Sequence, residues 1–235
     1  MSDTIRKPEI WHDERYERKC VAQVEDHGIL TGWIRRQTMA FQRAYPDRMV
    51  RSLYFDSPSL DDLGDTLSGV GERRKVRFRW YGERTDVESG VLEIKCKRHS
   101  LGVKLSYPIV LPEPLSSLSL DALVMIIARQ LPESVRPDVE HASQVVALIQ
   151  YKREYFVSWD KLVRVTLDRD VRIYDQLDRT QINANIQTAC PDVAVLELKY
   201  AADLDVDVRN SLEALPQRLS RFSKYSTGVQ AMLGV

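Results

Sequence analysis

Basic side chains recur at every second position of one segment in the first half of the chain. Within residues 73–81 they are Arg73, Lys75, Arg77 and Arg79, and the last three are separated by Val76 and Phe78. Neighbouring side chains of a β-strand point to opposite faces, so as a strand this segment has one cationic face, with successive charges about 7 Å apart. Like charges at that spacing need an anion to compensate them. Phosphate suits them best, because a guanidinium matches two phosphate oxygens at once and an ammonium adds a mobile point charge.

Three further segments sort their charges in the same way. The charged faces carry Glu93, Lys95 and Lys97 in residues 91–97, Arg164, Thr166, Asp168 and Asp170 in residues 162–170, and Glu197 and Lys199 in residues 193–200. Any one of them is explained most simply as the solvent-exposed face of an amphipathic strand. The four together favour another arrangement, because a solvated face usually mixes both signs with uncharged polar residues. If the strands close into a barrel with their apolar faces outward beneath helices, the charged faces line a tunnel for a polyanion.

The rest of the sequence supplies strands and helices for such a barrel. Strands are expected at residues 14–20, 51–55, 73–81, 91–98, 103–110, 145–158, 162–174 and 193–200, and helices at 27–44, after Asp26 as N-cap, and at 120–131, 206–215 and 224–233. No internal repeat, low-complexity tract or linker divides the chain, so residues 1–235 are expected to form a single domain. The predicted fold class is therefore α+β, an antiparallel β-barrel with helices packed outside.

The composition argues against nucleic acid and membrane as partners. The 34 basic and 34 acidic side chains cancel, and the basic residues follow strand spacing rather than helical spacing. The longest apolar run, residues 122–128, is far shorter than the roughly 20 residues of a membrane-spanning helix, and no apolar signal core stands at the N-terminus. We therefore expect a cytoplasmic protein without a membrane span. The three cysteines and four histidines lack metal-ligand spacing.

Taken in order, the short motifs of the chain resemble those of the VTC domain, a polyphosphate polymerase module among the triphosphate tunnel metalloenzymes. They are RYERK at 15–19, RKVRFR at 74–79, LEIKCK at 92–97, YKR at 151–153, ELK at 197–199 and SKY at 223–225. No one of them is specific, and the resemblance rests on their number and order along nearly the whole chain. It implies an antiparallel tunnel with a basic bore, in which a strand glutamate helps to hold Mg²⁺ or Mn²⁺.

The resemblance also implies roles for individual residues. The catalytic cations would be Arg77, Arg79, Lys95, Arg153 and Lys199. Further phosphate contacts would come from Lys19, Lys75, Lys97, Lys104, Arg164 and Lys224. Glu197 would be the main metal ligand, and Asp168 either joins the metal or neutralises Arg164. Glu17 and Glu93 each lie two residues from a lysine on the same face, which favours ion pairing over metal binding.

Two departures from the wider superfamily bear on the reaction. The related triphosphatases open with a Glu-x-Glu-x-Lys strand, whereas the corresponding positions here are Arg15, Glu17 and Lys19, which favours the VTC branch. Eukaryotic polymerase subunits carry a membrane segment, which this sequence lacks, so product export is expected to need a membrane-protein partner.

The expected activity is metal-dependent transfer of the γ-phosphate of ATP to a polyphosphate chain. A tripolyphosphatase or nucleoside triphosphatase of the same fold is one alternative, because water can replace the phosphate acceptor in nearly the same site. A non-catalytic polyphosphate-binding module is the other. Glu197 bears on that choice, because a pure binder gains nothing from an acid in a cationic tunnel. The oligomeric state is left open.

Overall fold

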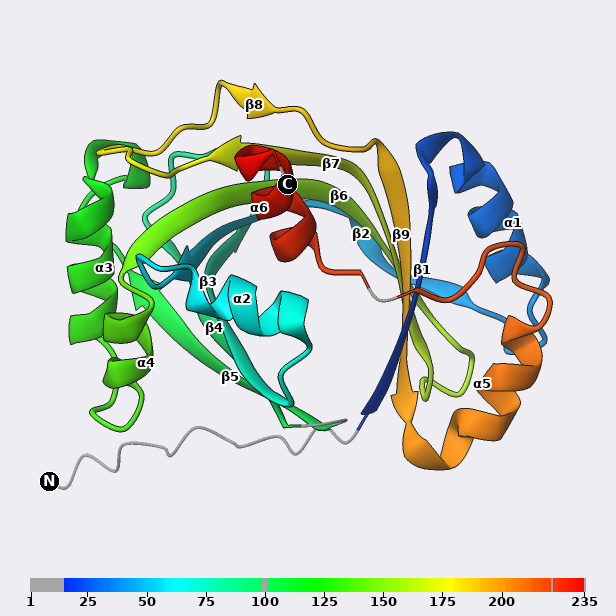
Figure 1. Ribbon diagram of the computed structural model, residues 1–235. Helices are drawn as coiled ribbons and strands as arrows, with labels where there is room; N and C mark the ends of the chain where they lie inside the picture. The colour runs from blue at the N-terminus through cyan, green and yellow to red at the C-terminus, as the bar shows by residue number, and fades with distance from the viewer. Residues whose placement is uncertain (1–14, 99–100, 221, 235) are drawn as a thin grey trace, which may run out of the picture.

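The computed structural model describes residues 15–98, 101–220 and 222–234, which fold into one curled antiparallel sheet with helices around it (Figure 1). The strands are β1 (Arg15–Gln23), β2 (Gln42–Asp56), β3 (Glu72–Tyr81), β4 (Ser89–Arg98), β5 (Leu101–Val110), β6 (Gln144–Val157), β7 (Arg164–Asp175), β8 (Gln187–Thr188) and β9 (Val193–Ala201). The helices are α1 (His27–Arg36), α2 (Asp61–Ser68), α3 (Leu120–Arg129), α4 (Arg136–His141), α5 (Asp205–Leu212) and α6 (Lys224–Leu233). The predicted fold class is confirmed.

The sheet curls until its two edges approach each other. Its strands follow the order β1-β9-β7-β6-β2-β3-β4-β5, and β8 pairs with β7 outside this path. β1 and β5 are therefore the edges among the described strands, and they are not joined by a backbone ladder. A side-chain contact spans the gap instead, because Lys95 Nζ on β4 lies 2.8 Å from Glu17 Oε2 on β1. The barrel is thus closed at this seam by an ion pair.

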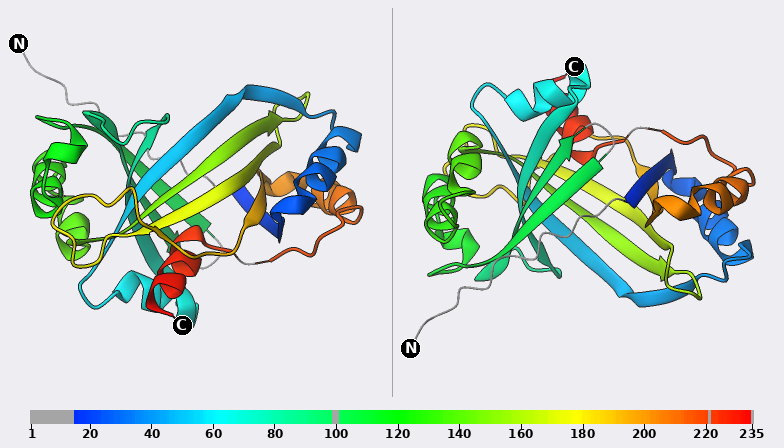
Figure 2. Two further views of the ribbon diagram at one scale, coloured as in Figure 1. Left: turned by 90° about the horizontal axis from the view of Figure 1, so that it is seen from above. Right: turned by 90° about the horizontal axis from the view of Figure 1, so that it is seen from below.

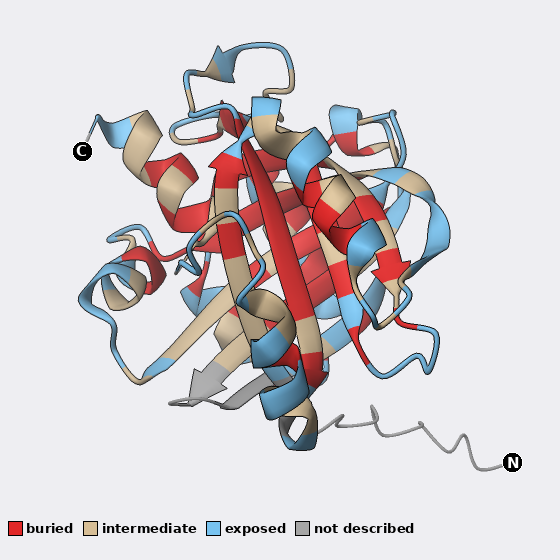
Figure 3. Cartoon of the chain, turned by 90° about the vertical axis from the view of Figure 1, so that its right-hand side faces the viewer, coloured by how far each residue is buried: buried red, intermediate tan, exposed pale blue. Residues whose placement is uncertain are grey.

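Helices cover the outer, apolar face of the sheet on two sides (Figure 2). α3 and α4 pack over Phe78, Leu92 and Ile94 of β3 and β4, within one cluster of buried residues. α1 and α5 pack over Leu196 and Leu198 of β9, within a second. Burial of each such side chain contributes about 1.5–3 kcal/mol, which fixes the register and turns the alternate, charged positions inward. Figure 3 shows the buried positions running along the central strands, with exposed positions gathered in loops and on helix surfaces.

α6 lies on the inner side of the curled sheet (Figure 1). Its Tyr225 and Val229 pack against Tyr54 of β2 and Tyr151 of β6 in a third buried cluster. The Tyr225 hydroxyl donates to Asp56 Oδ2, and Asp56 also accepts hydrogen bonds from the backbone amides of Asp62 and Leu63 in the first turn of α2. One buried carboxylate therefore holds the start of α2 and the start of α6 together.

The structure corrects one helix of the sequence prediction and adds two. The helix expected at 27–44 ends at Arg36, because the backbone of Gln37 is already extended with ψ 139°, and β2 begins at Gln42, after a left-handed Ala40 with φ 46°. β2 had been expected only at 51–55, since its first residues are exposed and carry no apolar alternation. α2 and α4 were not predicted. None of the helices in the described ranges is long and apolar enough to cross a membrane.

Candidate functional site

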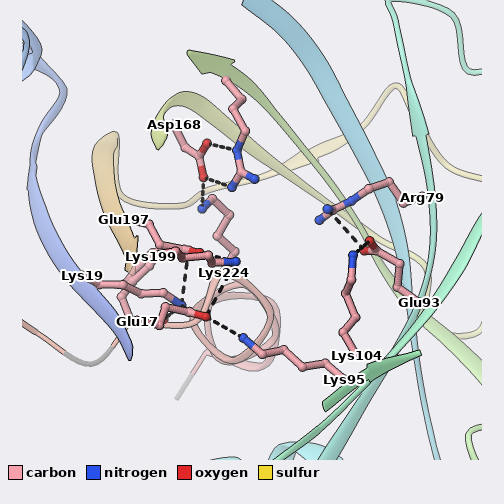
Figure 4. A network of polar contacts seen from close by, with 12 residues as sticks. Glu17, Lys19, Arg79, Glu93, Lys95, Lys104, Asp168, Glu197, Lys199 and Lys224 are labelled. Atoms are coloured by element: carbon pink, nitrogen blue, oxygen red, sulfur yellow. Dashed lines mark hydrogen bonds and ion pairs between the residues drawn. The ribbon is translucent and has the colours of Figure 1, made fainter. Parts of the chain in front are cut away.

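The charged faces of the strands meet inside the curled sheet, as predicted. Strand register places Glu17 opposite Lys199, Lys19 opposite Glu197, and Arg153 opposite Asp168. On the other half of the sheet, Arg77 lies opposite Glu93, and Lys95 lies opposite both Lys75 and Lys104. Residues opposite each other in an antiparallel pair share a face, so this register alone gathers the cations in the bore. The close-up in Figure 4 shows them converging from both halves of the sheet.

Two glutamates and three lysines form the first group of contacts, where β1 meets β9. Lys19 Nζ lies 2.6 Å from Glu17 Oε1 and 3.6 Å from Glu197 Oε2. Lys199 Nζ lies 2.9 Å from Glu197 Oε1 and 3.8 Å from Glu17 Oε2, and Lys95 reaches Glu17 from β4. Burial by itself raises the pKa of Glu197, but Lys199, Lys19 and Arg153 outweigh it and hold that pKa well below its ordinary value. Both carboxylates are thus ionised and shared among the lysines.

Glu93 is the centre of a second group, on β3, β4 and β5. Its Oε2 accepts from Arg77 Nε at 2.7 Å and lies 3.3 Å from Arg79 NH1, while its Oε1 accepts from Lys104 Nζ at 2.9 Å. Arg77, Arg79 and Lys104 lower the pKa of Glu93 despite its burial. With both oxygens engaged by cations, Glu93 has the geometry of an ion-pair partner that orients two arginines.

Asp168 anchors a third group, completely buried on β7. Arg153 makes a two-pronged contact with it, Nε to Oδ1 at 2.6 Å and NH2 to Oδ2 at 2.8 Å. Lys224, the first residue of α6, places its Nζ 2.5 Å from the same Oδ2. Asp168 therefore offsets one of the two positive charges of Arg153 and Lys224, and its oxygens point at these cations. Arg164, which the sequence analysis offered as its partner, is exposed at the first position of β7 and lies opposite Lys199.

Lys75 lies where the bore meets α6. Its Nζ donates to Ser223 Oγ at 2.7 Å, just before the first residue of that helix. The pKa of Lys75 is lowered to about 8, first by burial and then by the nearby cations Lys19, Arg73 and Lys95, against a raising effect of Tyr54. Folding therefore makes the charged form of Lys75 less favourable than it is in water.

The remaining predicted phosphate ligands differ in how far the structure describes them. Lys104 is about half exposed and engaged by Glu93. Lys97 lies on β4 with its backbone opposite Gly102, and its side chain lies outside the described part of the structure. The roles assigned to all these residues stay predictions.

The carboxylates of the bore are the candidate ligands for Mg²⁺ or Mn²⁺. In the described ranges, no group of three or more His, Cys, Asp and Glu side chains is placed to hold a metal unaided. Mg²⁺ does not need one, since it usually takes one or two carboxylates and completes its shell with water and substrate phosphates. Glu17 and Glu197 fit that pattern, because both carboxylates touch the same two lysines. Next to them, the buried Thr166 hydroxyl, opposite Glu197, has no hydrogen-bond partner among the described residues.

Hydroxyl groups are the part of the site that sequence reasoning missed. Arg79 donates to Ser52 Oγ and to the Tyr151 hydroxyl, both at 3.2 Å, and Arg77 NH1 donates to the Tyr54 hydroxyl at 2.9 Å. These contacts fix the two guanidinium planes. The available signal was strand alternation on β2 and β6, which puts these hydroxyls on the same face as the arginines.

The chain was compared with known families and structures. The family model described as VTC domain matches residues 14–233. No curated protein matches the chain. Among solved structures, it is similar to the PH1819 protein of Pyrococcus horikoshii, with 14% identity, 90% of this chain and 96% of the other covered, and a TM-score of 0.46. It is also similar to a proposed adenylate cyclase of Vibrio parahaemolyticus, with 13% identity, 86% and 83% covered, and a TM-score of 0.41.

Proposed function

The chain belongs to the VTC domain family, and on that premise we propose that it is a metal-dependent polyphosphate polymerase, which transfers the γ-phosphoryl group of ATP to the end of a polyphosphate chain. The observation that carries this proposal is the set of cations from β1, β3, β4, β5, β6, β9 and α6 that converge in one bore (Figure 4). Basic side chains outnumber carboxylates there, so the bore has unsatisfied positive charge that a chain of phosphates would neutralise.

Phosphoryl transfer needs alignment and charge more than covalent chemistry. Attacking and leaving oxygens must lie in line, and cations must offset the charge that spreads over the transferred group. Arg77 and Arg79, held by Glu93 and by hydroxyl groups, are pre-oriented to bind phosphate oxygens in pairs. Arg153, held by Asp168, faces them from β6. Lys95 on β4 and Lys199 on β9 have flexible side chains, so their ammonium groups would move with a phosphate and stay in contact with it.

Glu197 would hold Mg²⁺ or Mn²⁺, and Glu17, an ion-pair partner of Lys19 and Lys95, lies beside it and would add a second carboxylate. The metal, when bound, would neutralise charge on the phosphate oxygens. Lys199 and Lys19 keep both carboxylates ionised and ready for a cation. The unpartnered Thr166 hydroxyl would donate to a phosphate or to water in the same place.

Phosphorus NMR of the purified protein with ATP and Mn²⁺ tests the reaction. A signal of chain-internal phosphate that grows with time is the expected result. Orthophosphate alone, most clearly with tripolyphosphate as substrate, would make the protein a hydrolase. Tight polyphosphate binding without turnover of either substrate would leave only the binding module.

A substitution of Glu197 tests the metal assignment. Glu197→Gln removes one negative charge and preserves size, so turnover should fall at least 100-fold while tripolyphosphate still binds. Calorimetric titration measures binding, and the NMR assay measures turnover. Glu213→Gln, exposed after α5, is the matched control and should behave like the unmodified protein. Unchanged turnover in Glu197→Gln would refute the metal assignment.

A further inference from the structure

Three tyrosines surround one arginine at the start of β2, and none of them belongs to the ion-pair groups of the bore. The guanidinium carbon of Arg48 lies 5.1 Å from the ring centre of Tyr45, 5.8 Å from that of Tyr81 and 6.0 Å from that of Tyr155. Tyr45 and Tyr155 meet edge to face, with ring centres 5.6 Å apart. We call these four residues the mouth cluster.

A bulge in β2 turns the mouth cluster toward the bore. Tyr45 and Arg48 are three residues apart, so in a regular strand they would point to opposite faces. Their partners Tyr155 and Arg153 on β6 are only two apart, which means that β2 carries one extra residue here. Bulges of this kind redirect side chains and are frequent next to functional sites. The result is that Tyr45 and Arg48 share the face of Arg153.

The mouth cluster is continuous with the phosphate-binding residues. The guanidinium carbon of Arg153 lies 6.0 Å from the Tyr155 ring centre on one side and is fixed by Asp168 on the other. Tyr155 therefore contacts both Arg153 in the bore and Arg48 outside it. Arg79, which donates to the Tyr151 hydroxyl, is two residues from Tyr81 on the same face of β3.

Two tyrosines and the arginine of the mouth cluster are open to solvent. Tyr45 is 55% exposed and Tyr81 is 50% exposed, and Arg48 is exposed between them. Burial raises the pKa of Tyr155 to about 12, so its ring is a neutral phenol near pH 7. Flat aromatic and guanidinium surfaces left uncovered beside a cationic bore are suited to a ligand with a flat ring at the end of an anionic chain.

We propose that the mouth cluster binds the nucleobase of a nucleoside triphosphate whose phosphates occupy the bore, by stacking on the Tyr45 ring and the guanidinium plane of Arg48. This inference rests on the proposed function and adds the residues that would hold the base of the phosphate donor. Stacking uses the π-face that every base has, so the cluster favours nucleoside triphosphates over inorganic tripolyphosphate without choosing strongly among bases.

Calorimetric titrations with a non-hydrolysable ATP analogue and with tripolyphosphate, without added metal, test the proposal. In Tyr45→Ala, affinity for the analogue should fall about fivefold or more, while affinity for tripolyphosphate should stay within twofold of the unmodified protein. Arg48→Lys, which keeps the charge but removes the plane, should show the same selective loss. Tyr45→Phe, which keeps the ring, should bind both ligands normally.

The matched control is another tyrosine–arginine pair, in which the tyrosine is exposed and the arginine is half-buried. Arg18 lies 5.2 Å from the ring centre of Tyr16, on the outer face of β1, so Tyr16→Ala should change neither affinity. Equal losses for both ligands in Tyr45→Ala, or no loss for either, would overturn the nucleobase site alone. An unmodified protein that binds neither ligand would overturn the proposed function, and the nucleobase site with it.

Discussion

At the scale of single residues, the bore pairs nearly every cation with a carboxylate or a hydroxyl before any ligand enters. Glu93 orients Arg77, Arg79 and Lys104, and Asp168 orients Arg153 and Lys224. A buried charge without a partner is costly, so these carboxylates stabilise the empty bore while leaving it with excess positive charge. Lys75 contacts no carboxylate in the described ranges, because its partners there, the Ser223 hydroxyl and the Tyr225 ring, are uncharged.

Lys75 should therefore report ligand binding as proton uptake. Its pKa of about 8 means that at pH 8.5 part of the Lys75 population is neutral, and a phosphate nearby would return that pKa toward its usual value of about 10.4. Tripolyphosphate binding at pH 8.5 should thus take up protons, and binding at pH 6.5 should take up fewer. Calorimetry in buffers of different ionisation enthalpy measures the uptake.

Two variants separate the contributions to this uptake. Lys75→Met should remove the share that belongs to Lys75. Arg77 and Arg79 outweigh burial and lower the pKa of Tyr54 to about 8, so Tyr54→Phe should remove a second share. Proton uptake at pH 8.5 that is unchanged in Lys75→Met would show that phosphate does not reach Lys75.

At the scale of elements, α2 and α6 are joined through buried acidic groups. Asp56 receives hydrogen bonds from the first turn of α2 and from Tyr225. Asp62 is also buried, and its Oδ2 has no hydrogen-bond partner among the described residues. Burial, together with the negative charge of Asp56, raises the pKa of Asp62 to about 7.

Asp62 should therefore make stability depend on pH. Between its unfolded pKa of about 4 and its folded value of about 7, the folded chain binds more protons than the unfolded chain, so this residue lowers stability as pH rises through that window. Asp62→Asn cannot ionise and should gain about 2 kcal/mol relative to the unmodified protein at pH 8, and much less at pH 5. Urea unfolding at both pH values measures the difference. An equal effect at the two values would contradict the assignment.

The sequence predicted the charged strands well and the connecting elements poorly, for a physical reason. Strands β3, β4, β7 and β9 are amphipathic with period two, and their register follows once the apolar face is buried. α2 was missed because only part of one face is buried, beneath α6, a contact distant in sequence. The partners of Asp168 could not be predicted either, because Arg153 and Lys224 come from β6 and α6 and their meeting depends on how α6 docks.

At the scale of the whole molecule, the seam between the sheet edges should respond to ligand. Lys95 and Glu17 make a contact across it that joins β4 to β1. In Lys95→Met, hydrogen exchange of β1 amides should become faster while the central strand β6 stays protected, because β6 is paired on both sides. Tripolyphosphate should slow β1 exchange in the unmodified protein, since under the proposed function phosphate would bind cations on both sides of the seam.

The control for the exchange experiment is Lys161→Met, an exposed lysine in the turn between β6 and β7. It should leave exchange of β1 as in the unmodified protein. Uniformly faster exchange across all strands in Lys95→Met would indicate general loss of stability and would contradict a local role of the seam.

Under the proposed polymerase activity, the seam also bears on how a long product would leave. A polymer inside a barrel with continuous backbone pairing can only slide out end first, and friction along the bore then grows with its length. Here the edge strand β1 is held to β4, the neighbour of the other edge strand, by a contact between side chains, which thermal motion breaks far more readily than a ladder of hydrogen bonds. A chain of phosphates could therefore leave through the opened seam between β1 and β4, and its rate of release would then not depend on its length.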